Sequence, residues 1–295
     1  MTGAERGYLM LCCDLAEPDA KPLTLPQLRK LRQRMQQAKA PIEPDRDLMA
    51  RDLVALGYNW EQAERIEALL SREKKLDEYL RLAEEYKVKI FTCATPCYPH
   101  QLLKQLGDDA PAVLFCRGDT SLLARRCVGL VGSRQISQHN RYFAEKIGMM
   151  VAQEGFVLVS GNAVGADQAA QDSCFATGGS VISFLPDDLI YHRPQRRQLL
   201  VAADSFHAQF TAARALQRNT LIHAMAEKIF VAQCDLGHGG TWAGTTENLR
   251  RKLSEVYLYN DHSPAMYELE SRGAVLLASN FGSLYTLRPT QMCMF

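Results

Sequence analysis

Short apolar runs alternate with helix-length segments through most of the chain beyond residue 85, and this alternation restricts the fold more than any other feature. A helical pattern between two of the runs, from about Asn140, carries Phe143, Ile147 and Met150 on one face. The runs themselves are continuous and bounded by glycine or polar residues, and they cover 88–91, 127–131, 156–159, 181–185, 229–232, 256–259 and 275–277. Such runs joined through helices are typical of a parallel sheet that is covered on both faces. We therefore predict an α/β fold with a doubly wound, mostly parallel sheet.

The first 85 residues follow a different pattern. Leu and Ala recur there every three or four residues among Arg, Glu and Gln, which predicts amphipathic helices over 25–32, 47–53 and 60–86, the last with Asn59 as its N-cap. The charged residues of these helices are interpreted as a solvated face rather than a nucleic-acid contact. The sequence thus predicts a helical module over 1–85, an α/β domain over 86–280 and a tail over 281–295.

The overall charge excludes a protein whose whole surface binds nucleic acid, because 34 Lys and Arg face 33 Asp and Glu for a net charge of +1. It leaves room for one local cationic groove. No apolar run approaches the ~20 residues of a spanning helix, and the N-terminus lacks the pattern of a secretory signal. We expect a cytoplasmic protein without membrane contact. The 9 cysteines form no CxxC pair, so we expect reduced thiols, no metal site and no cofactor.

Three loops rich in Gly, Ser and Thr follow predicted strands, and in such sheets ligands bind beyond the carboxyl ends of the strands. Glycine lets the backbone approach an anion, while N–H groups and a helix N-terminus favour phosphate. Arg134 adds a bidentate guanidinium. Each loop alone is equally compatible with a tight turn. The candidate phosphate-binding residues are Gly132, Ser133, Arg134, Ser160, Gly161, Gly165, Asp167, Gly239, Gly240, Thr241, Gly244 and Thr245.

A basic stretch between residues 190 and 220 interleaves arginines with aromatic residues. This composition suits single-stranded nucleic acid, whose phosphates need cations and whose bases need stacking partners. It suits equally a solvated loop with phenylalanines in the core. The residues concerned are Arg193, Arg196, Arg197, Arg214 and Arg218 with Tyr191, Phe206 and Phe210.

No catalytic constellation can be identified. Ser133 and Ser160 have no evident His–carboxylate partner, and the lysine of a Walker loop is missing. Asp167, at the start of a predicted helix, is interpreted as a cap or loop anchor rather than as a general base. We expect a binding protein and no enzyme.

An ordered set of motifs points to a known family. The motifs are Val131-Gly132-Ser133-Arg134, Ser160-Gly161 with Ala163, Gly165 and Asp167, then Gly178-Gly179, Arg218-Asn219, and Gly239-Gly240-Thr241 with Gly244-Thr245. Over about residues 86–280 this set resembles the DprA/Smf family of DNA-processing proteins. The resemblance implies a Rossmann-like domain that binds and protects single-stranded DNA and helps to load a RecA-type recombinase during transformation or recombination.

The same resemblance implies a homodimer, a non-catalytic role and an N-terminal module similar in place to a sterile-alpha-motif-like domain. It also implies that Arg134, Ser160, Gly161 and the pair Arg218-Asn219 line the DNA pocket. Departures from the family pattern indicate a divergent member: Gln171 stands where the family has histidine, Thr220 where it has arginine, and the glycine expected soon after Ser137 is replaced near Asn140.

A second hypothesis concerns small nucleotides. The loop from Gly239 to Glu247 is similar to that of lysine-decarboxylase-like nucleotide phosphoribohydrolases, in which Glu247 would assist glycosidic cleavage and the loop would hold a 5′-phosphate. A nucleotide sensor would use the same loop. A third hypothesis is a scaffold whose glycine loops are only turns.

Overall fold

The computed structural model describes residues 1–17, 19–38, 48–203, 205–278 and 281–287. The chain forms two compact units. The first comprises Met1–Tyr98, Asp108–Phe115 and Ala203–His207, and the second comprises Pro99–Gly107, Cys116–Ala202 and Ala208–Phe295. The three-part division made from the sequence stays a prediction, and residues 288–295 of its tail lie outside the described residues.

The first unit is built from helices that pack on one another. They are α1 (Gly3–Cys12), α2 (Leu25–Gln36), α3 (Ala50–Ala55), α4 (Trp60–Leu70) and α5 (Glu73–Glu85), followed by β1 (Lys89–Thr92) and the first residues of β2 (Val113–Gly118). The Asn59 side chain caps α4 by accepting from the Gln62 N–H at 2.8 Å, as its position predicts. Helix α1 packs on α4 and α5.

The prediction of one long helix over 60–86 is wrong, because the helical segment is interrupted after Leu70 and resumes at Glu73. The break places the Arg72 guanidinium against carbonyl groups at the end of α1, where it donates to Met10 and, at 2.8 Å, to Cys13. Arg72 thereby satisfies acceptors that a helix end leaves unpaired. Position 47 of the helix predicted over 47–53 lies outside the described residues.

The second unit contains a parallel sheet, which confirms the predicted fold class. Its strands are β3 (Cys127–Val131), β4 (Val157–Ser160), β5 (Ser180–Phe184), β6 (Gln198–Ala203), β7 (Lys228–Val231), β8 (Glu255–Leu258) and β9 (Val275–Leu276). Their order is β6-β5-β4-β3-β7-β8-β9, and each adjacent pair is parallel. Strand β6 lies inside the basic stretch between residues 190 and 220, where the sequence analysis predicted no strand.

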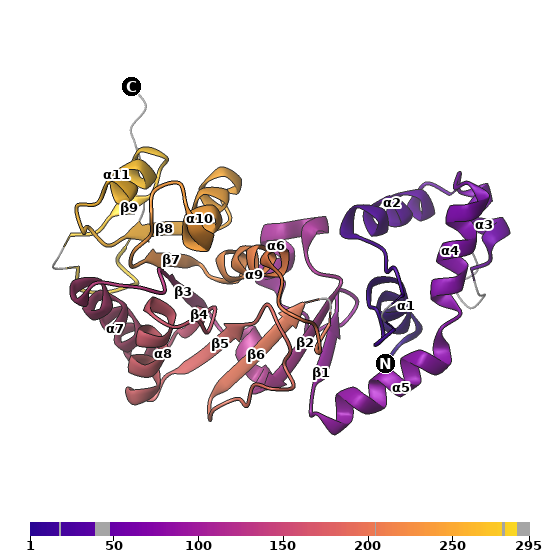
Figure 1. The fold of residues 1–295 in the computed structure, drawn as a ribbon, viewed down its shortest axis with the longest axis horizontal. Coiled ribbons are helices and arrows are strands. Elements are labelled where there is room, and N and C mark those ends of the chain that lie inside the picture. The colour runs from indigo at the N-terminus through magenta and orange to yellow at the C-terminus, as the bar shows by residue number, and fades with distance from the viewer. Residues whose placement is uncertain (18, 39–47, 204, 279–280, 288–295) are drawn as a thin grey trace. The chain divides into compact units, whose positions relative to one another are not determined.

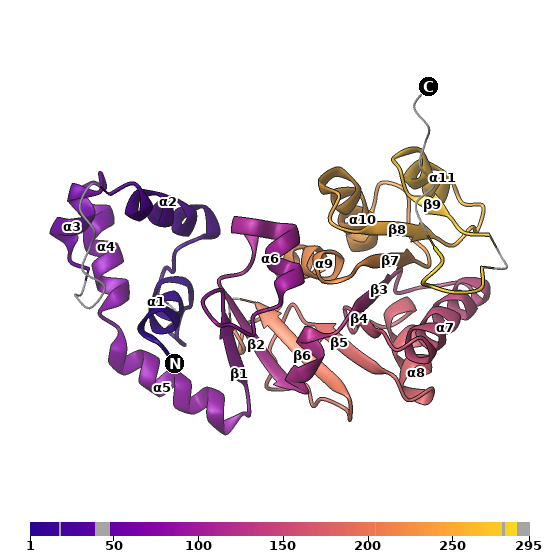
Figure 2. The same cartoon turned by 180° about the vertical axis from the view of Figure 1, so that it is seen from behind.

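Helices cover both faces of this sheet. They are α6 (His100–Leu106), α7 (Gln138–Gln153), α8 (Ala166–Ala176), α9 (Ala212–Met225), α10 (Gly239–Arg251) and α11 (Pro264–Ser271), with 3-10 turns η1 (Gly107–Asp109) and η2 (Thr120–Ala124). Figures 1 and 2 show α7 and α8 on one side of β3 and β4, with α9 and α10 on the other. All residues of β3 are buried, and successive side chains of a strand point to opposite faces, so both faces of β3 need a covering layer of helices.

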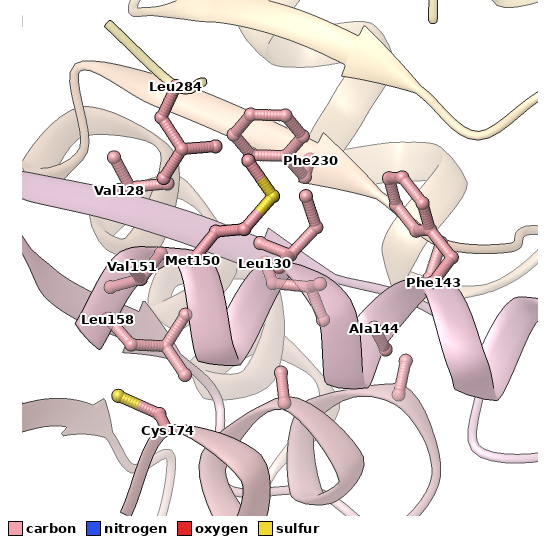
Figure 3. Packing of buried hydrophobic residues seen from close by; sticks show 14 of the residues in the cluster. Val128, Leu130, Phe143, Ala144, Met150, Val151, Leu158, Cys174, Phe230 and Leu284 are labelled. Carbon is pink, nitrogen blue, oxygen red and sulfur yellow. The ribbon is translucent and has the colours of Figure 1, made fainter. Parts of the chain in front are cut away.

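The core on the α7 and α8 side is apolar and closely packed. Val128 and Leu130 of β3 meet Phe143 and Met150 of α7 there, and Leu158 and Cys174 belong to the same cluster (Figure 3). This cluster fixes α7 and α8, and thereby the loops that precede them. Among the described residues, no helix is long and apolar enough to cross a membrane.

The strand order contains a point where the chain reverses its direction across the sheet. From β3 the chain runs outward through β4 and β5 to β6, then returns through α9 to β7 on the other side of β3. The loops after β3 and its neighbours therefore separate at the carboxyl ends of the strands. In doubly wound sheets this crevice is where ligands bind.

Candidate nucleic-acid interface

A pocket of about 340 Å³ lies at this crevice. It is bounded by the end of β3, the loop before α8, one face of α9 and the start of α10. The residues that line it are Val131, Gly132, Ser133, Arg134, Ala163, Asp167, Ala215, Arg218, Asn219, Ile222, His223, Asp235, His238, Gly239, Gly240 and Thr241. The three loops singled out from the sequence thus meet at one site, together with the Arg218-Asn219 motif.

Backbone contacts hold the three loops against one another. Ser133 donates its N–H to the carbonyl of Gln233 at 2.9 Å and accepts from the Ala166 N–H at 3.2 Å, so it links β7 to the start of α8. Gly165 has a φ of +92°, and a Cβ there would overlap the carbonyl oxygens of Ser133 and Arg134. Glycine is required at 165 by both its backbone conformation and this close approach.

A buried ion pair forms one wall of the pocket. Oδ2 of Asp167 accepts from the N–H groups of Gly161 at 3.0 Å and Ala163 at 3.4 Å, and lies 3.9 Å from Nη1 of Arg218. Only 8% of the Asp167 side chain and 12% of the Arg218 side chain is exposed. Burial raises the pKa of Asp167 to about 6, although Arg218 and the two N–H groups act in the opposite direction.

The place of Arg218 depends on a glycine. A Cβ at Gly161 would overlap Nη1 of Arg218, so the guanidinium occupies the space that any side chain at 161 would fill. Among the described residues, no group is hydrogen-bonded to the fully buried Nε of Arg218, so the position of this side chain depends on Asp167 and on the missing side chain at Gly161.

Arg134 and the start of α10 form the exposed part of the pocket. Arg134 is exposed, and no described carboxylate lies within ion-pair distance of it. Helix α10 begins at Gly239 without a side-chain cap, so its first N–H groups and its positive dipole end face the cavity. Asn219 fixes this helix end by donating from Nδ2 to the Gly240 carbonyl at 2.9 Å.

Several predicted residues lie beneath the pocket rather than on its surface. Ser160 is fully buried and accepts from the Gln171 side chain. Gly161 and Gly165 shape the loop as described above. Gly244 packs against Asn219 and His223, and Thr245 is fully buried. Their contribution is to place the lining residues.

Other residues named from the sequence lie outside the lining. Of the five arginines in the basic stretch, Arg218 alone lines the pocket among the described residues. Phe206 is buried in the first unit, where its ring packs on Tyr79 at 4.7 Å and Phe115 at 5.5 Å, as the core interpretation predicts. Trp242, in the first turns of α10 but not named above, also lies outside the lining; the guanidinium carbon of Arg272 lies 5.4 Å from its ring centre.

The sequence reasoning did not identify His223, Asp235 and His238 as part of the site. His223 lies one helical turn beyond Asn219 on the same face of α9, so the spacing of four residues from the Arg218-Asn219 motif was the available signal. Within the described residues, no group of three or more His, Cys, Asp or Glu residues is arranged to hold a metal ion.

The model of the family "DNA recombination-mediator protein A" matches residues 89–280. The chain belongs to this family. Among its relatives, Protein Smf of Synechocystis is 33% identical over 143 residues, which cover 45% of this chain and 35% of that protein. DNA processing protein DprA of Streptococcus pneumoniae is 32% identical over 130 residues, 43% of this chain and 45% of that protein. The match therefore spans less than half the length of either relative.

Solved structures show the same fold. The DprA structure from Streptococcus pneumoniae has a TM-score of 0.60 at 21% identity and covers 86% of this chain and 95% of that one. A structure of DNA processing protein A from Helicobacter pylori describes the single-stranded DNA binding mode of that protein. It has a TM-score of 0.55 at 20% identity and covers 64% of this chain and 90% of that one. The resemblance to the DprA/Smf family stated from the motifs is confirmed.

Proposed function

We propose that the pocket of the second unit binds single-stranded DNA and that the chain acts as a recombination mediator. The observation that carries this proposal is the meeting of Arg134, Arg218 and the start of α10 at one pocket, in a chain of the recombination-mediator family. The Helicobacter pylori relative, which binds single-stranded DNA, supports the choice of ligand.

The chemistry of the pocket suits a phosphate of the DNA backbone. The exposed Arg134 guanidinium and the uncapped N–H groups at the start of α10 are donors that match phosphate oxygens. Contacts of this kind carry no sequence information, so binding is independent of sequence and weakens with salt. Thr220, which replaces a family arginine, is half-buried and donates to the Leu216 carbonyl at 3.4 Å, so the cationic contacts fall to Arg134 and Arg218.

The second family departure is accommodated inside the domain. Gln171 is buried, donates to Ser160 and lies 3.5 Å from the Ser183 hydroxyl, which in turn accepts from Gln198 at 3.0 Å. This buried polar network links β4, β5 and β6 through α8. Gln171 therefore supports the strand ends beneath the pocket and leaves the phosphate-binding donors in place.

In this role the chain would protect the bound strand, help to load a RecA-type recombinase and act as a homodimer, without catalysing a reaction. The hydrolase hypothesis is less well supported, because Glu247 lies outside the pocket lining and both its carboxylate oxygens bond Arg250, at 2.6 and 2.8 Å. Those contacts lower the pKa of Glu247 and direct it to the outer surface of α10.

Titration of labelled oligonucleotides by fluorescence anisotropy tests the proposal. We expect a single-stranded oligonucleotide to bind more tightly than a duplex of equal length, and both to bind less tightly as salt rises from 50 to 200 mM, on the order of tenfold or more for several phosphate contacts. Equal affinity for duplex and single strand, or binding that does not respond to salt, would overturn the proposal.

A further inference from the structure

The side-chain amide of Asn248 is fixed in one orientation. Its Oδ1 accepts from the backbone N–H of Ser254 at 3.0 Å, and a backbone N–H is only a donor, so this atom must be the oxygen. The amide nitrogen Nδ2 therefore points to the other side, where it contacts Nδ1 of His223 at 2.8 Å and the Ser254 hydroxyl at 2.9 Å.

This orientation determines where the imidazole of His223 carries its proton. Since Nδ2 of Asn248 is a donor, Nδ1 of His223 must accept, and the proton of the neutral ring lies on Nε2. His223 is 1% exposed, and burial lowers its pKa to about 3, so the ring is neutral at pH 7. The chain thus holds His223 as a permanent Nε2–H donor.

The Nε2–H donor belongs to a residue that lines the pocket, and it has no hydrogen-bond partner among the described residues. His223 lines the pocket, and within the described part of the chain no group is hydrogen-bonded to its Nε2. A Cβ built on Gly244 would lie 3.1 Å from Nε2, so the Nε2 edge of the ring is turned toward Gly244. Gly244 is one turn nearer than Asn248 to the start of α10, where the pocket opens. Nε2 of His223 is not one of the fully buried polar atoms that lack a partner among the described residues, so this N–H reaches accessible space, where a ligand can supply an acceptor.

The pocket has a charged mouth and a buried part that combines apolar side chains with His223. The exposed lining residues include Arg134, Gly239 and Gly240, which are the phosphate donors described above. The buried lining residues are Val131 at 7%, Ile222 at 1% and His223 at 1% exposure, together with Asp167 at 6%, which is paired with Arg218 in the wall. A flat base with apolar faces fits this buried part, whereas the ionic donors that a phosphate needs lie at the mouth.

We propose that His223 donates a hydrogen bond from Nε2 to the base of the nucleotide whose phosphate lies at the mouth of the pocket. The proposal rests on the proposed binding of single-stranded DNA and adds a base contact to it. All four bases carry an acceptor nitrogen or oxygen on an edge, so one N–H donor holds a base without selecting its identity. Asn248 and Ser254 are positioning residues, because they set the tautomer that His223 presents.

Two oligonucleotides of equal length separate a base contact from a phosphate contact: oligo-dT, and a fully abasic strand with the same phosphates. In the full-length chain, His223→Phe replaces the imidazole by a ring of similar size that has no donor. We expect it to weaken binding of oligo-dT by about threefold to tenfold and to leave binding of the abasic strand unchanged. His223→Gln, which retains an N–H donor, should recover part of the loss.

Each outcome of this experiment is decisive. Equal weakening of both strands by His223→Phe would overturn the base contact, as would no weakening of either. Failure of the unmodified chain to bind oligo-dT at all would instead overturn the proposed function. A measurement without any variant keeps the test valid if His223→Phe does not fold: ¹⁵N NMR of the unmodified chain at pH 7 should show the proton of His223 on Nε2, and a proton on Nδ1 would contradict the proposal.

Discussion

Two arginines lie at opposite ends of the same strand, β3, and their side chains have different surroundings. Arg126, before the strand, donates from Nε and Nη2 to the carboxylate of Glu227 at 2.8 and 2.7 Å, and its guanidinium lies 4.9 Å from the ring centre of Phe156. Arg134, after the strand, is exposed with no described carboxylate in ion-pair range, at the mouth of a pocket. The charge at the amino end is neutralised within the fold, while the charge at the carboxyl end is available to a ligand.

The same contrast holds for the two ends of β4. Gly155 precedes the strand in a left-handed turn with a φ of +75°, and no atom lies within 4 Å of a Cβ built there. Gly161 follows the strand, and its missing side chain leaves the space for Arg218. A glycine at the amino end makes a turn, whereas the glycine at the carboxyl end makes room for a functional group. This difference indicates that the polar groups able to bind a ligand are concentrated at the carboxyl ends of the strands.

The largest effect is expected from Gly161→Ala. The new Cβ takes the space of Nη1 of Arg218, so the guanidinium must move and its ion pair with Asp167 is weakened, at a cost of up to about 3–5 kcal/mol of unfolding free energy. Single-stranded DNA binding should fall with it. Chemical denaturation and anisotropy titration measure the two effects.

Gly155→Ala is the matched control at the other end of β4. An alanine in a left-handed conformation costs about 1–2 kcal/mol, and DNA affinity should not change. Loss of DNA affinity in Gly155→Ala equal to that in Gly161→Ala would show that stability, and not the place of Arg218, controls binding.

An effect of intermediate size concerns the dependence of stability on pH. The pKa of Asp167 rises on folding from 3.8 to about 6, so the folded state holds more protons than the unfolded state between these values. The contribution of Asp167 to the free energy of unfolding is therefore present at low pH and is lost as the pH rises from about 4 to 6. We expect Asp167→Asn to gain about 3 kcal/mol relative to the unmodified chain over that interval.

His223 changes the pH dependence of stability in the opposite direction. Its pKa falls on folding from 6.5 to about 3, so the unfolded state binds the extra proton and stability increases as the pH rises through this range. His223→Phe should therefore lose stability relative to the unmodified chain between pH 4 and 6, while Asp167→Asn gains it. Urea denaturation of both variants at several pH values measures the two trends, and trends of the same sign would contradict the burial of one of the two groups.

The sequence predicted the strands and loops around the pocket well, but it did not predict the buried residues behind them. The strand 127–131 and the helix from Ala166 were found because apolar runs and glycine turns are local signals. Strand β6 was missed because the short segment 198–203 directly follows Arg196 and Arg197 and was included in the basic stretch. His223 and Asn248 were missed because only the packing of α9 on α10 brings them together.

Salt titration of Arg134→Ala and Arg126→Ala tests the central claim most directly, since both variants remove one guanidinium at opposite ends of β3. We expect Arg134→Ala to weaken binding of single-stranded DNA by about tenfold to hundredfold and to reduce the slope of log affinity against log salt by about 0.7, the value for one phosphate contact. Arg126→Ala should change neither quantity. Equal effects of the two variants, or a larger effect of Arg126→Ala, would contradict a DNA site at the carboxyl end of the sheet.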